Sequence, residues 1–220
     1  MAITIVDLLI FDLDGTLIDS KLDLAQAVNA TRAHLGMAPL ENERVYSYVG
    51  NGAPVLIRRA LGDQATEAEV QDALEFFLAY YRAHPLDFTR LYPGVKESLE
   101  RLSAAGKRMA VLTNKPVGIS RAILEGLGVY GCFFQVYGGN SLEFKKPHPA
   151  GVEALMREAG VGRGATLMVG DSGVDVETAR NAGIQCCGVT YGFQPESLAN
   201  PAPDKLVDRM EELADWLLVR

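Results

Sequence analysis

The chain has 220 residues, of which 48% are hydrophobic and 22% are charged, a composition typical of a globular protein with a substantial core. Its formal net charge of −7 argues against general affinity for nucleic acids or anionic membranes, so neither is expected as a partner. No signal peptide is recognisable, and no stretch approaches the roughly 20 apolar residues of a membrane-spanning helix. The three cysteines form neither a disulfide framework nor a zinc pattern, which favours a cytoplasmic location.

The first predicted element is a strand within residues 5–16, in a run rich in branched apolar residues. Such continuous hydrophobicity is typical of a strand buried on both faces of a parallel sheet. Asp12 and Asp14 stand at its C-terminal end, where alternate side chains share a face. Two nearby carboxylates repel each other, so the pair is expected to need a cation, a shared proton or a catalytic role. The competing interpretation is an ordinary turn, in which Asp and Gly serve the backbone geometry.

The region that follows this strand is predicted to be helical, without a convincing strand. Thr66 and Glu69 are spaced as a capping box and should open a long helix that ends before Pro85. A helical insertion on two connections over the mouth of a sheet would act as a lid. The predicted division is therefore a core domain of residues 1–16 and 89–220 and a cap domain of residues 17–88.

Beyond the insertion, helical stretches alternate with apolar segments that resemble the first strand. Glycines follow these helices and should stop them in the left-handed conformation. Further strands are predicted at Arg108–Thr113, Phe133–Gly138, Thr166–Asp171 and Gln185–Thr190. A final amphipathic helix is expected from Met210 to Leu217. The predicted fold class is α/β, with a Rossmann-like parallel sheet, helices on both faces and a small inserted helical cap.

Polar side chains follow several of these predicted strands. The carboxyl ends of parallel strands meet at one edge of a sheet, which is where open α/β proteins place their ligands. The set brought to that edge is Asp12, Asp14, Thr113, Asn114, Lys146 and Asp171. Each has a plain structural alternative, such as a helix cap for Asp171 or a solvated charge for Lys146. As a group, these residues indicate metal-assisted chemistry, and their oxygen ligands favour Mg²⁺.

Four segments resemble the motifs of the haloacid dehalogenase superfamily, in the same order and with similar spacing. They read Phe-Asp-Leu-Asp-Gly-Thr-Leu-Ile-Asp-Ser (11–20), Leu-Thr-Asn-Lys-Pro (112–116), Lys-Lys-Pro-His-Pro (145–149) and Gly-Asp-Ser-Gly-Val-Asp (170–175). The predicted insertion is similar to the small helical cap of that superfamily. Within it, residues 48–53, 113–116 and 189–192 most resemble bacterial phosphoglycolate phosphatases.

The resemblance implies a Mg²⁺-dependent phosphomonoester hydrolase that acts through an aspartyl-phosphate. Asp12 would attack phosphorus, which divides one difficult step into two. Asp14 would protonate the leaving oxygen and then take a proton from the hydrolytic water. Mg²⁺ would be held by Asp12, by Asp171 and, in the family pattern, by the backbone carbonyl of Asp14.

The remaining residues at the edge are expected to support this chemistry. The Thr113 hydroxyl and the Asn114 backbone N–H would hold phosphoryl oxygens, while Lys146 would balance the negative charge. Asp175 would orient either the metal site or Lys146 from behind. Lys115, by contrast, is expected to be solvated, because nothing in the sequence directs it into the site.

Substrate specificity is expected to lie in the cap. Gly50, Asn51 and Gly52 precede a predicted helix, whose free backbone N–H groups suit an anion such as a substrate carboxylate. Arg58 or Arg59 could add a cation, although both arginines could equally face water beside a plain turn. The expected substrate is a small phosphorylated metabolite, above all 2-phosphoglycolate. The chain is expected to be a monomer or a homodimer.

Other functions compete with this one. A haloacid dehalogenase lacks the second aspartate, so Asp14 argues against that activity. A phosphatase of another small substrate, such as a sugar phosphate or pyrophosphate, shares the site residues and stays open, as does a phosphosugar mutase. A phosphate-accepting signalling receiver also combines acids, Thr and Lys, but it is much shorter and lacks a helical insertion.

Overall fold

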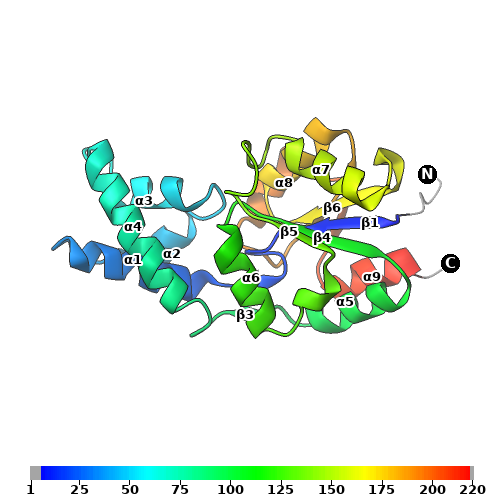
Figure 1. The fold of residues 1–220 in the computed structure, drawn as a ribbon, viewed down its shortest axis with the longest axis horizontal. Coiled ribbons are helices and arrows are strands. Elements are labelled where there is room, and N and C mark those ends of the chain that lie inside the picture. Colours follow the sequence, from blue (N-terminus) through cyan, green and yellow to red (C-terminus); the bar gives the residue numbers. More distant parts are fainter. Residues whose placement is uncertain (1–5, 219–220) are drawn as a thin grey trace.

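A computed structural model describes residues 6–218 and shows an α/β region beside a group of helices (Figure 1). The centre of the α/β region is a six-stranded sheet in the order β5-β4-β1-β6-β7-β8, in which every neighbouring pair is parallel. Its strands are β1 (Leu8–Phe11), β4 (Arg108–Leu112), β5 (Gln135–Tyr137), β6 (Thr166–Gly170), β7 (Gln185–Val189) and β8 (Lys205–Val207). The later predicted strands are confirmed, with ends that differ by up to two residues. Ile5, within the first predicted strand, lies outside the described residues.

Helices cover both faces of this sheet, as predicted (Figure 1). They are α5 (Val95–Ala104), α6 (Val117–Gly126) and α9 (Met210–Leu218) on one face, and α7 (Ala150–Ala159) and α8 (Gly173–Ala182) on the other. Short 3₁₀ turns precede three of the strands: η1 (Tyr130–Cys132) before β5, η2 (Arg163–Ala165) before β6 and η3 (Pro195–Ala199) before β8. The predicted glycine stops are confirmed, because the glycines after α5, α6, α7 and α8 all have φ between 66° and 75°.

Strand β1 shows why a continuous apolar run becomes the middle of such a sheet. Its four side chains are fully buried, and alternate residues point to opposite faces. Leu9 and Phe11 belong to the apolar cluster that includes α5, α6 and α9. Leu8 and Ile10 belong to a second cluster with α7 and α8. Because both faces are covered, the polar residues that follow the strand can lie only at its open end.

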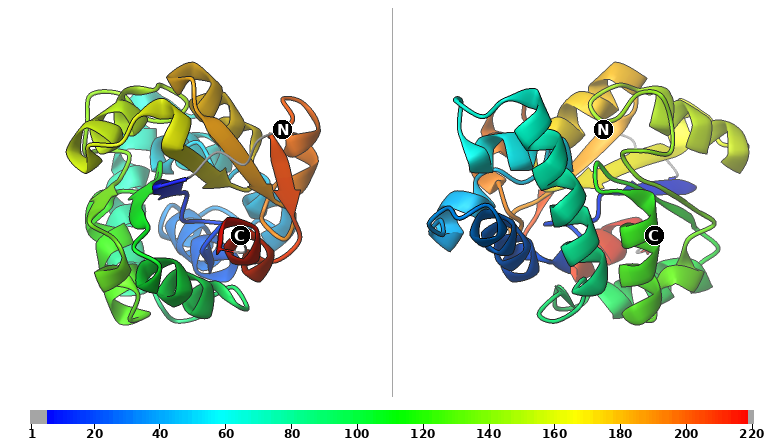
Figure 2. Two further views of the ribbon diagram at one scale, coloured as in Figure 1. Left: turned by 90° about the vertical axis from the view of Figure 1, so that its right-hand side faces the viewer. Right: turned by 60° about the vertical axis from the view of Figure 1, so that its left-hand side comes forward.

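The helical group inserted after β1 contains α1 (Lys21–His34), α2 (Asn42–Tyr46), α3 (Ala53–Leu61) and α4 (Glu67–Ala83). The turned views of Figure 2 show these helices, in blue to cyan, together beyond one end of the sheet. The predicted capping box is confirmed: Thr66 accepts a hydrogen bond from the Glu69 backbone, and the Glu69 carboxylate accepts one from the Thr66 backbone. In the described part of the chain, no helix is both long and apolar enough to cross a membrane.

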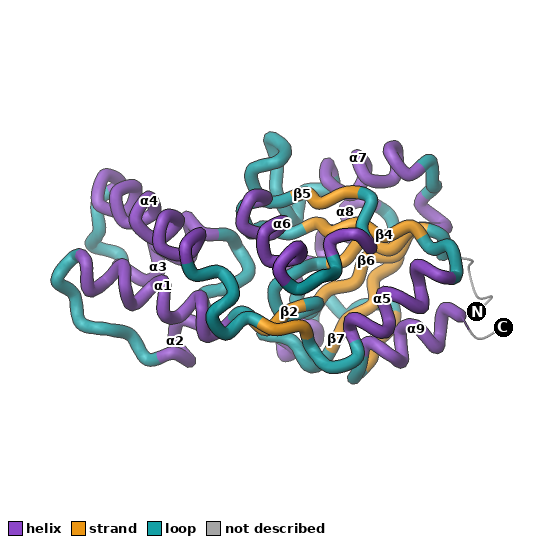
Figure 3. Tube along the Cα trace, turned by 60° about the horizontal axis from the view of Figure 1, so that its bottom comes forward, coloured by secondary structure: helices purple, strands orange, loops and turns teal. Residues whose placement is uncertain are grey.

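A two-stranded antiparallel ribbon joins the helical group to the sheet region (Figure 3). It pairs β2 (Ile18–Asp19) with β3 (Arg90–Leu91), so that Ile18 lies opposite Leu91. The expectation of no strand after residue 16 was therefore wrong at β2. Two residues carry no periodic signal, and the partner strand is distant in the sequence. The boundaries predicted for core and cap, at 16/17 and 88/89, fall on or next to this ribbon and stay a prediction.

Candidate active site

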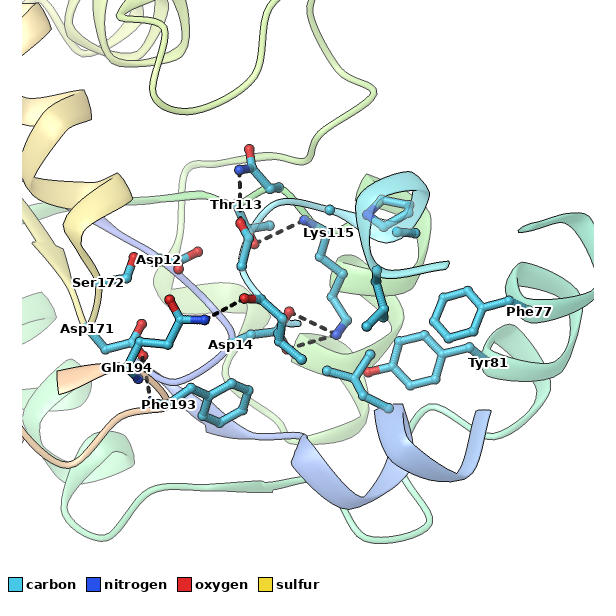
Figure 4. Close-up of a pocket in the computed structure, with 18 residues that line it drawn as sticks. Asp12, Asp14, Phe77, Tyr81, Thr113, Lys115, Asp171, Ser172, Phe193 and Gln194 are labelled. Carbon is cyan, nitrogen blue, oxygen red and sulfur yellow. Dashed lines mark hydrogen bonds and ion pairs between the residues drawn. The ribbon is translucent and has the colours of Figure 1, made fainter. Parts of the chain in front are cut away.

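A cavity of about 630 Å³, including its opening to solvent, lies between the carboxyl ends of β1, β4 and β6 and the helical group (Figure 4). Asp12, Thr113 and Asp171 each directly follow the last residue of one of these strands. The sheet thus supplies polar groups to the floor of the cavity. The helical group supplies apolar and aromatic walls: Leu24, Val49, Leu56, Phe77 and Tyr81.

Lys146 lies between two carboxylates beside the cavity floor. Its Nζ is 2.8 Å from Asp12 Oδ1 and 2.7 Å from Asp175 Oδ1, and all three side chains are buried. Burial by itself would lower the pKa of Lys146, but the two carboxylates raise it overall, so the ammonium stays charged. Asp175 also accepts hydrogen bonds from the Ser172 backbone and hydroxyl in the capping box that opens α8. The hydrogen bonds at this helix start orient the Asp175 carboxylate, and its ion pair with Lys146 orients the ammonium in turn.

Asp171 is held from the opposite side of the floor. Its Oδ2 accepts a hydrogen bond of 2.7 Å from the Phe193 backbone, and its Oδ1 accepts one of 3.3 Å from the Thr16 hydroxyl. Two glycines make room for the carboxylate, because a Cβ at Gly15 or Gly192 would overlap it. Gly15 also has a φ of 82°, which other residues rarely adopt. Asp171 is therefore confined by backbone on two sides.

The acidic groups of the floor are crowded. Ligand atoms of Asp12, Asp171 and Asp175 all lie within 4.8 Å of one another, and the three residues are buried. Burial is the largest cause that raises the pKa of Asp12 to about 6 and that of Asp171 to about 8. When all three are ionised, one Lys146 ammonium leaves two negative charges, which a divalent cation would neutralise.

These residues fit a hard divalent cation such as Mg²⁺, which prefers carboxylate oxygens. Asp12 and Asp171 line the cavity, whereas Asp175 is fully buried outside its lining and is paired with Lys146, so Asp12 and Asp171 are the better candidates for direct ligands. The expected contribution of the Asp14 backbone carbonyl stays a prediction.

Asp14 forms a second charged pair, with Lys115. The Lys115 Nζ is 2.8 and 3.0 Å from the two oxygens of Asp14, and the Ser20 hydroxyl donates to the same carboxylate at 2.5 Å. The expectation that Lys115 is solvated was wrong, since only 6% of the residue is exposed. The reason is tertiary: helix α4 places the Tyr81 ring 4.6 Å from the ammonium.

Thr113 and Asn114 lie at the end of β4, between floor and cap. The Thr113 hydroxyl accepts a hydrogen bond from the Lys115 backbone at 3.3 Å, and a hydroxyl keeps one hydrogen to donate. The Asn114 side chain donates at 3.1 Å both to the Gly50 carbonyl and to the Lys146 carbonyl. Asn114 therefore connects the cap loop to the loop that carries Lys146.

Only some of the residues predicted to bind substrate from the cap line the cavity. Gly50 and Gly52 line the cavity, whereas Asn51 and Arg59 line a neighbouring, more open cavity. Arg58 is directed away from both, because its guanidinium pairs with Glu67 and donates to the Ala65 carbonyl. The cation expected from the cap arginines is thus not brought to the described cavity.

Sequence reasoning missed several residues of the cavity. Tyr81 and Phe77 lie one turn apart on α4, where an apolar stripe reads as ordinary core. Phe193 and Gln194 follow β7 by a few residues, at the same edge of the sheet as the known candidates. The rule that ligands bind at the carboxyl ends of parallel strands could have identified the second pair. No local signal identifies the first.

Comparison with known proteins agrees with this geometry. Residues 9–189 match the family described as haloacid dehalogenase-like hydrolase. Phosphoglycolate phosphatase of Rhodospirillum rubrum is 41% identical over 215 residues, which cover 94% of this chain and 89% of the relative. Its namesake in Colwellia psychrerythraea is 41% identical over 214 residues, with 94% and 95% covered.

Solved structures give the same answer. A crystal structure of a predicted phosphoglycolate phosphatase from Haemophilus somnus 129pt has a TM-score of 0.90 and 36% sequence identity, and the match covers 96% of this chain and 98% of that one. The expected resemblance, both to the superfamily and to bacterial phosphoglycolate phosphatases, is confirmed. Family match, sequence identity and fold together show that the chain belongs to the haloacid dehalogenase-like hydrolases.

Proposed function

We propose that the protein is a Mg²⁺-dependent phosphatase that hydrolyses 2-phosphoglycolate to glycolate and phosphate through an aspartyl-phosphate. One observation carries the proposal: Asp12, paired with buried Lys146, and Asp14 line the same cavity from the end of one strand. The names of the relatives in Rhodospirillum rubrum and Colwellia psychrerythraea support the choice of substrate. Free thiols at all three cysteines support a cytoplasmic location.

In the first half of the proposed reaction, a carboxylate oxygen of Asp12 attacks phosphorus while the bond to the ester oxygen breaks. Asp14 gives its proton to that leaving oxygen, and glycolate departs. In the second half, Asp14 takes a proton from water as the water attacks the phosphoryl group, which frees Asp12 and releases phosphate. Mg²⁺, held by Asp12, Asp171 and the Asp14 carbonyl, would supply positive charge against the phosphoryl oxygens.

Other side chains of the floor stabilise charge in this scheme. The Thr113 hydroxyl and the Asn114 backbone N–H bind phosphoryl oxygens, whose charge spreads during the transfer. Lys146 keeps positive charge next to Asp12. Asp175 acts through Lys146, to which it is bound at 2.7 Å, and not on the substrate.

The cap closes the cavity over the substrate in this proposal. Gly50 and Gly52 form part of the wall, and the absence of side chains lets the backbone approach a small ligand. Arg58 has no role in the proposal because it is bound to Glu67. A cavity with aromatic and aliphatic walls that come from the cap suits a compact metabolite.

A screen for phosphate release tests the proposal, with a panel that contains 2-phosphoglycolate, sugar phosphates and pyrophosphate. We expect the highest kcat/KM for 2-phosphoglycolate, in the presence of Mg²⁺ only. Asp12→Asn is nearly isosteric, so it should fold normally yet lose roughly four orders of magnitude or more in kcat. A better substrate elsewhere in the panel would contradict the proposed substrate. An isomerised sugar without phosphate release would instead indicate a mutase.

A further inference from the structure

Two polar groups interrupt the apolar, cap-facing wall of the cavity: the Lys115 ammonium and the Tyr81 hydroxyl. Tyr81 comes from α4 and is 1% exposed, and its hydroxyl has no hydrogen-bond partner among the described residues. Figure 4 shows this hydroxyl directed toward the side of the cavity where Lys115 meets Asp14. Phe77 and other apolar cap side chains surround the pair. A buried hydroxyl is stabilised by a hydrogen-bond partner, and a molecule bound in the cavity beside Lys115 can supply one.

The charges of the cavity restrict where an anionic group can bind. Among the described residues that line it, Asp12, Asp14 and Asp171 are acidic, and only Lys115 is basic. Lys146 lies behind Asp12 and pairs with Asp12 and Asp175. For a substrate that carries a negative group besides its phosphate, Lys115 is the one cationic partner among the described residues that line the cavity.

The position of Lys115 also sets a length for the substrate. Its Nζ contacts both oxygens of Asp14, at 2.8 and 3.0 Å, and an ammonium has a third hydrogen to donate. Asp14 is the proposed proton donor to the ester oxygen. A group only two covalent bonds beyond that oxygen therefore lies within reach of Lys115. The carboxylate of a phosphorylated 2-hydroxy acid occupies that place.

We propose that Lys115 and Tyr81 bind the substrate carboxylate and thereby select short phosphomonoesters with a carboxylate on the ester carbon. Lys115 gives the charged hydrogen bond, and the Tyr81 hydroxyl gives a neutral one from the cap. Burial raises the pKa of Tyr81 to about 12, so its hydroxyl remains protonated at neutral pH. The inference rests on the proposed function, because it assigns residues to the carboxylate of that substrate.

The test compares 2-phosphoglycolate with ethyl phosphate, a similar ester that lacks the carboxylate. The measured quantity is the ratio of their kcat/KM values in Tyr81→Phe, in Lys115→Met and in two controls, Tyr80→Phe on the same helix and Lys96→Met on an exposed site. We expect the ratio to fall about tenfold in Tyr81→Phe and more in Lys115→Met, since charged hydrogen bonds are stronger. The controls should keep the wild-type ratio.

The ratio separates recognition of the carboxylate from a general effect on Asp14. If Lys115 only positions Asp14, Lys115→Met slows both esters by the same factor, and an unchanged ratio in both variants overturns the inference. Tyr81→Phe removes a single oxygen, so it keeps the test decisive even if Lys115→Met fails to fold. If the wild-type enzyme shows no preference for 2-phosphoglycolate over ethyl phosphate, the proposed function itself fails, which is a different result.

Discussion

The Lys146 side chain stabilises the fold in addition to its proposed role in catalysis. It is the cation between Asp12 and Asp175, and all three side chains are buried. Removing one partner from a buried ionic group leaves the remaining charges without compensation, which costs more than the pair itself contributes. Stability and activity are thus coupled at this one side chain.

We expect Lys146→Met to lower the free energy of unfolding by about 3 to 5 kcal/mol in metal-free buffer, besides abolishing activity. Urea unfolding monitored by circular dichroism measures the loss. The matched control is the exposed Lys96→Met, which should change stability by less than about 1 kcal/mol. Equal stability of Lys146→Met and wild type would contradict the arrangement of charges described here.

The contrast between Lys146 and Lys115 shows what sequence alone could predict about the site. Asp12, Thr113 and Asp171 were predictable because each follows a recognisable strand, and strand ends meet at one edge. The burial of Lys115 was not predictable, because it depends on where the Tyr81 ring of the cap comes to rest. The role predicted for Arg58 was wrong for a similar reason. Its partner Glu67 lies beyond the loop that follows α3, and the sequence does not show in which direction that loop turns.

At the scale of elements, the cap loop is fastened to the core by three consecutive carbonyls. The Val49 carbonyl accepts from Gln194 at 2.7 Å, that of Gly50 from Asn114 at 3.1 Å, and that of Asn51 from Lys145 at 2.9 Å. All three donors are side chains outside the cap helices. Because the backbone of Gln194 also approaches Asp171, at 3.4 Å, this latch is continuous with the acidic floor.

Gln194→Ala should loosen the latch and leave the fold intact, because it removes one bond between loops. We expect faster amide hydrogen exchange in residues 49–56 and a KM for 2-phosphoglycolate raised a few-fold, roughly the effect of one hydrogen bond. Hydrogen exchange read by mass spectrometry measures the first effect. Gln71→Ala, on the exposed face of α4, is the control. Unchanged exchange in the cap loop would show that the latch does not hold the cap.

The connection that leads from α4 back to the sheet is held by a buried carboxylate. Asp23 at the start of α1 accepts hydrogen bonds from the Phe88 backbone and from the backbone and hydroxyl of Thr89, at 2.6 to 3.1 Å. Asp23→Ala leaves these donors unpaired, and we expect a loss of about 2 to 3 kcal/mol in the free energy of unfolding. Thermal unfolding measures it, with exposed Asp72→Ala as the control. A loss no larger than in the control would contradict this role.

Long elements were predictable from sequence, whereas short ones were not. Helix α4 carries an explicit capping box and a long apolar pattern, so its start was predicted correctly. The ribbon of β2 and β3 has two residues in each strand, which is too short for any period to show. Strand β8 was missed as well: it has three residues at the edge of the sheet, preceded by two prolines. Pairing with distant neighbours creates such strands.

At the scale of the whole molecule, metal should stabilise the fold by relieving the crowded carboxylates. A ligand that binds only the native state adds about 2.7 kcal/mol when its free concentration is one hundred times its dissociation constant. We therefore expect Mg²⁺ to raise the Tm of the wild-type protein, and to raise it much less in Asp171→Asn. Differential scanning calorimetry over a Mg²⁺ series measures this. Equal shifts in both proteins would place the metal elsewhere.

The proposed mechanism requires that Asp12 becomes phosphorylated during turnover. The most direct measurement is an acid quench of the enzyme in the steady state with 2-phosphoglycolate and Mg²⁺, followed by mass spectrometry of its peptides. We expect one added phosphoryl group on the peptide that contains Asp12, and none in Asp12→Asn or in chelator. Full turnover by Asp12→Asn, or a wild-type enzyme that turns over with no phosphoryl group on Asp12, would contradict it.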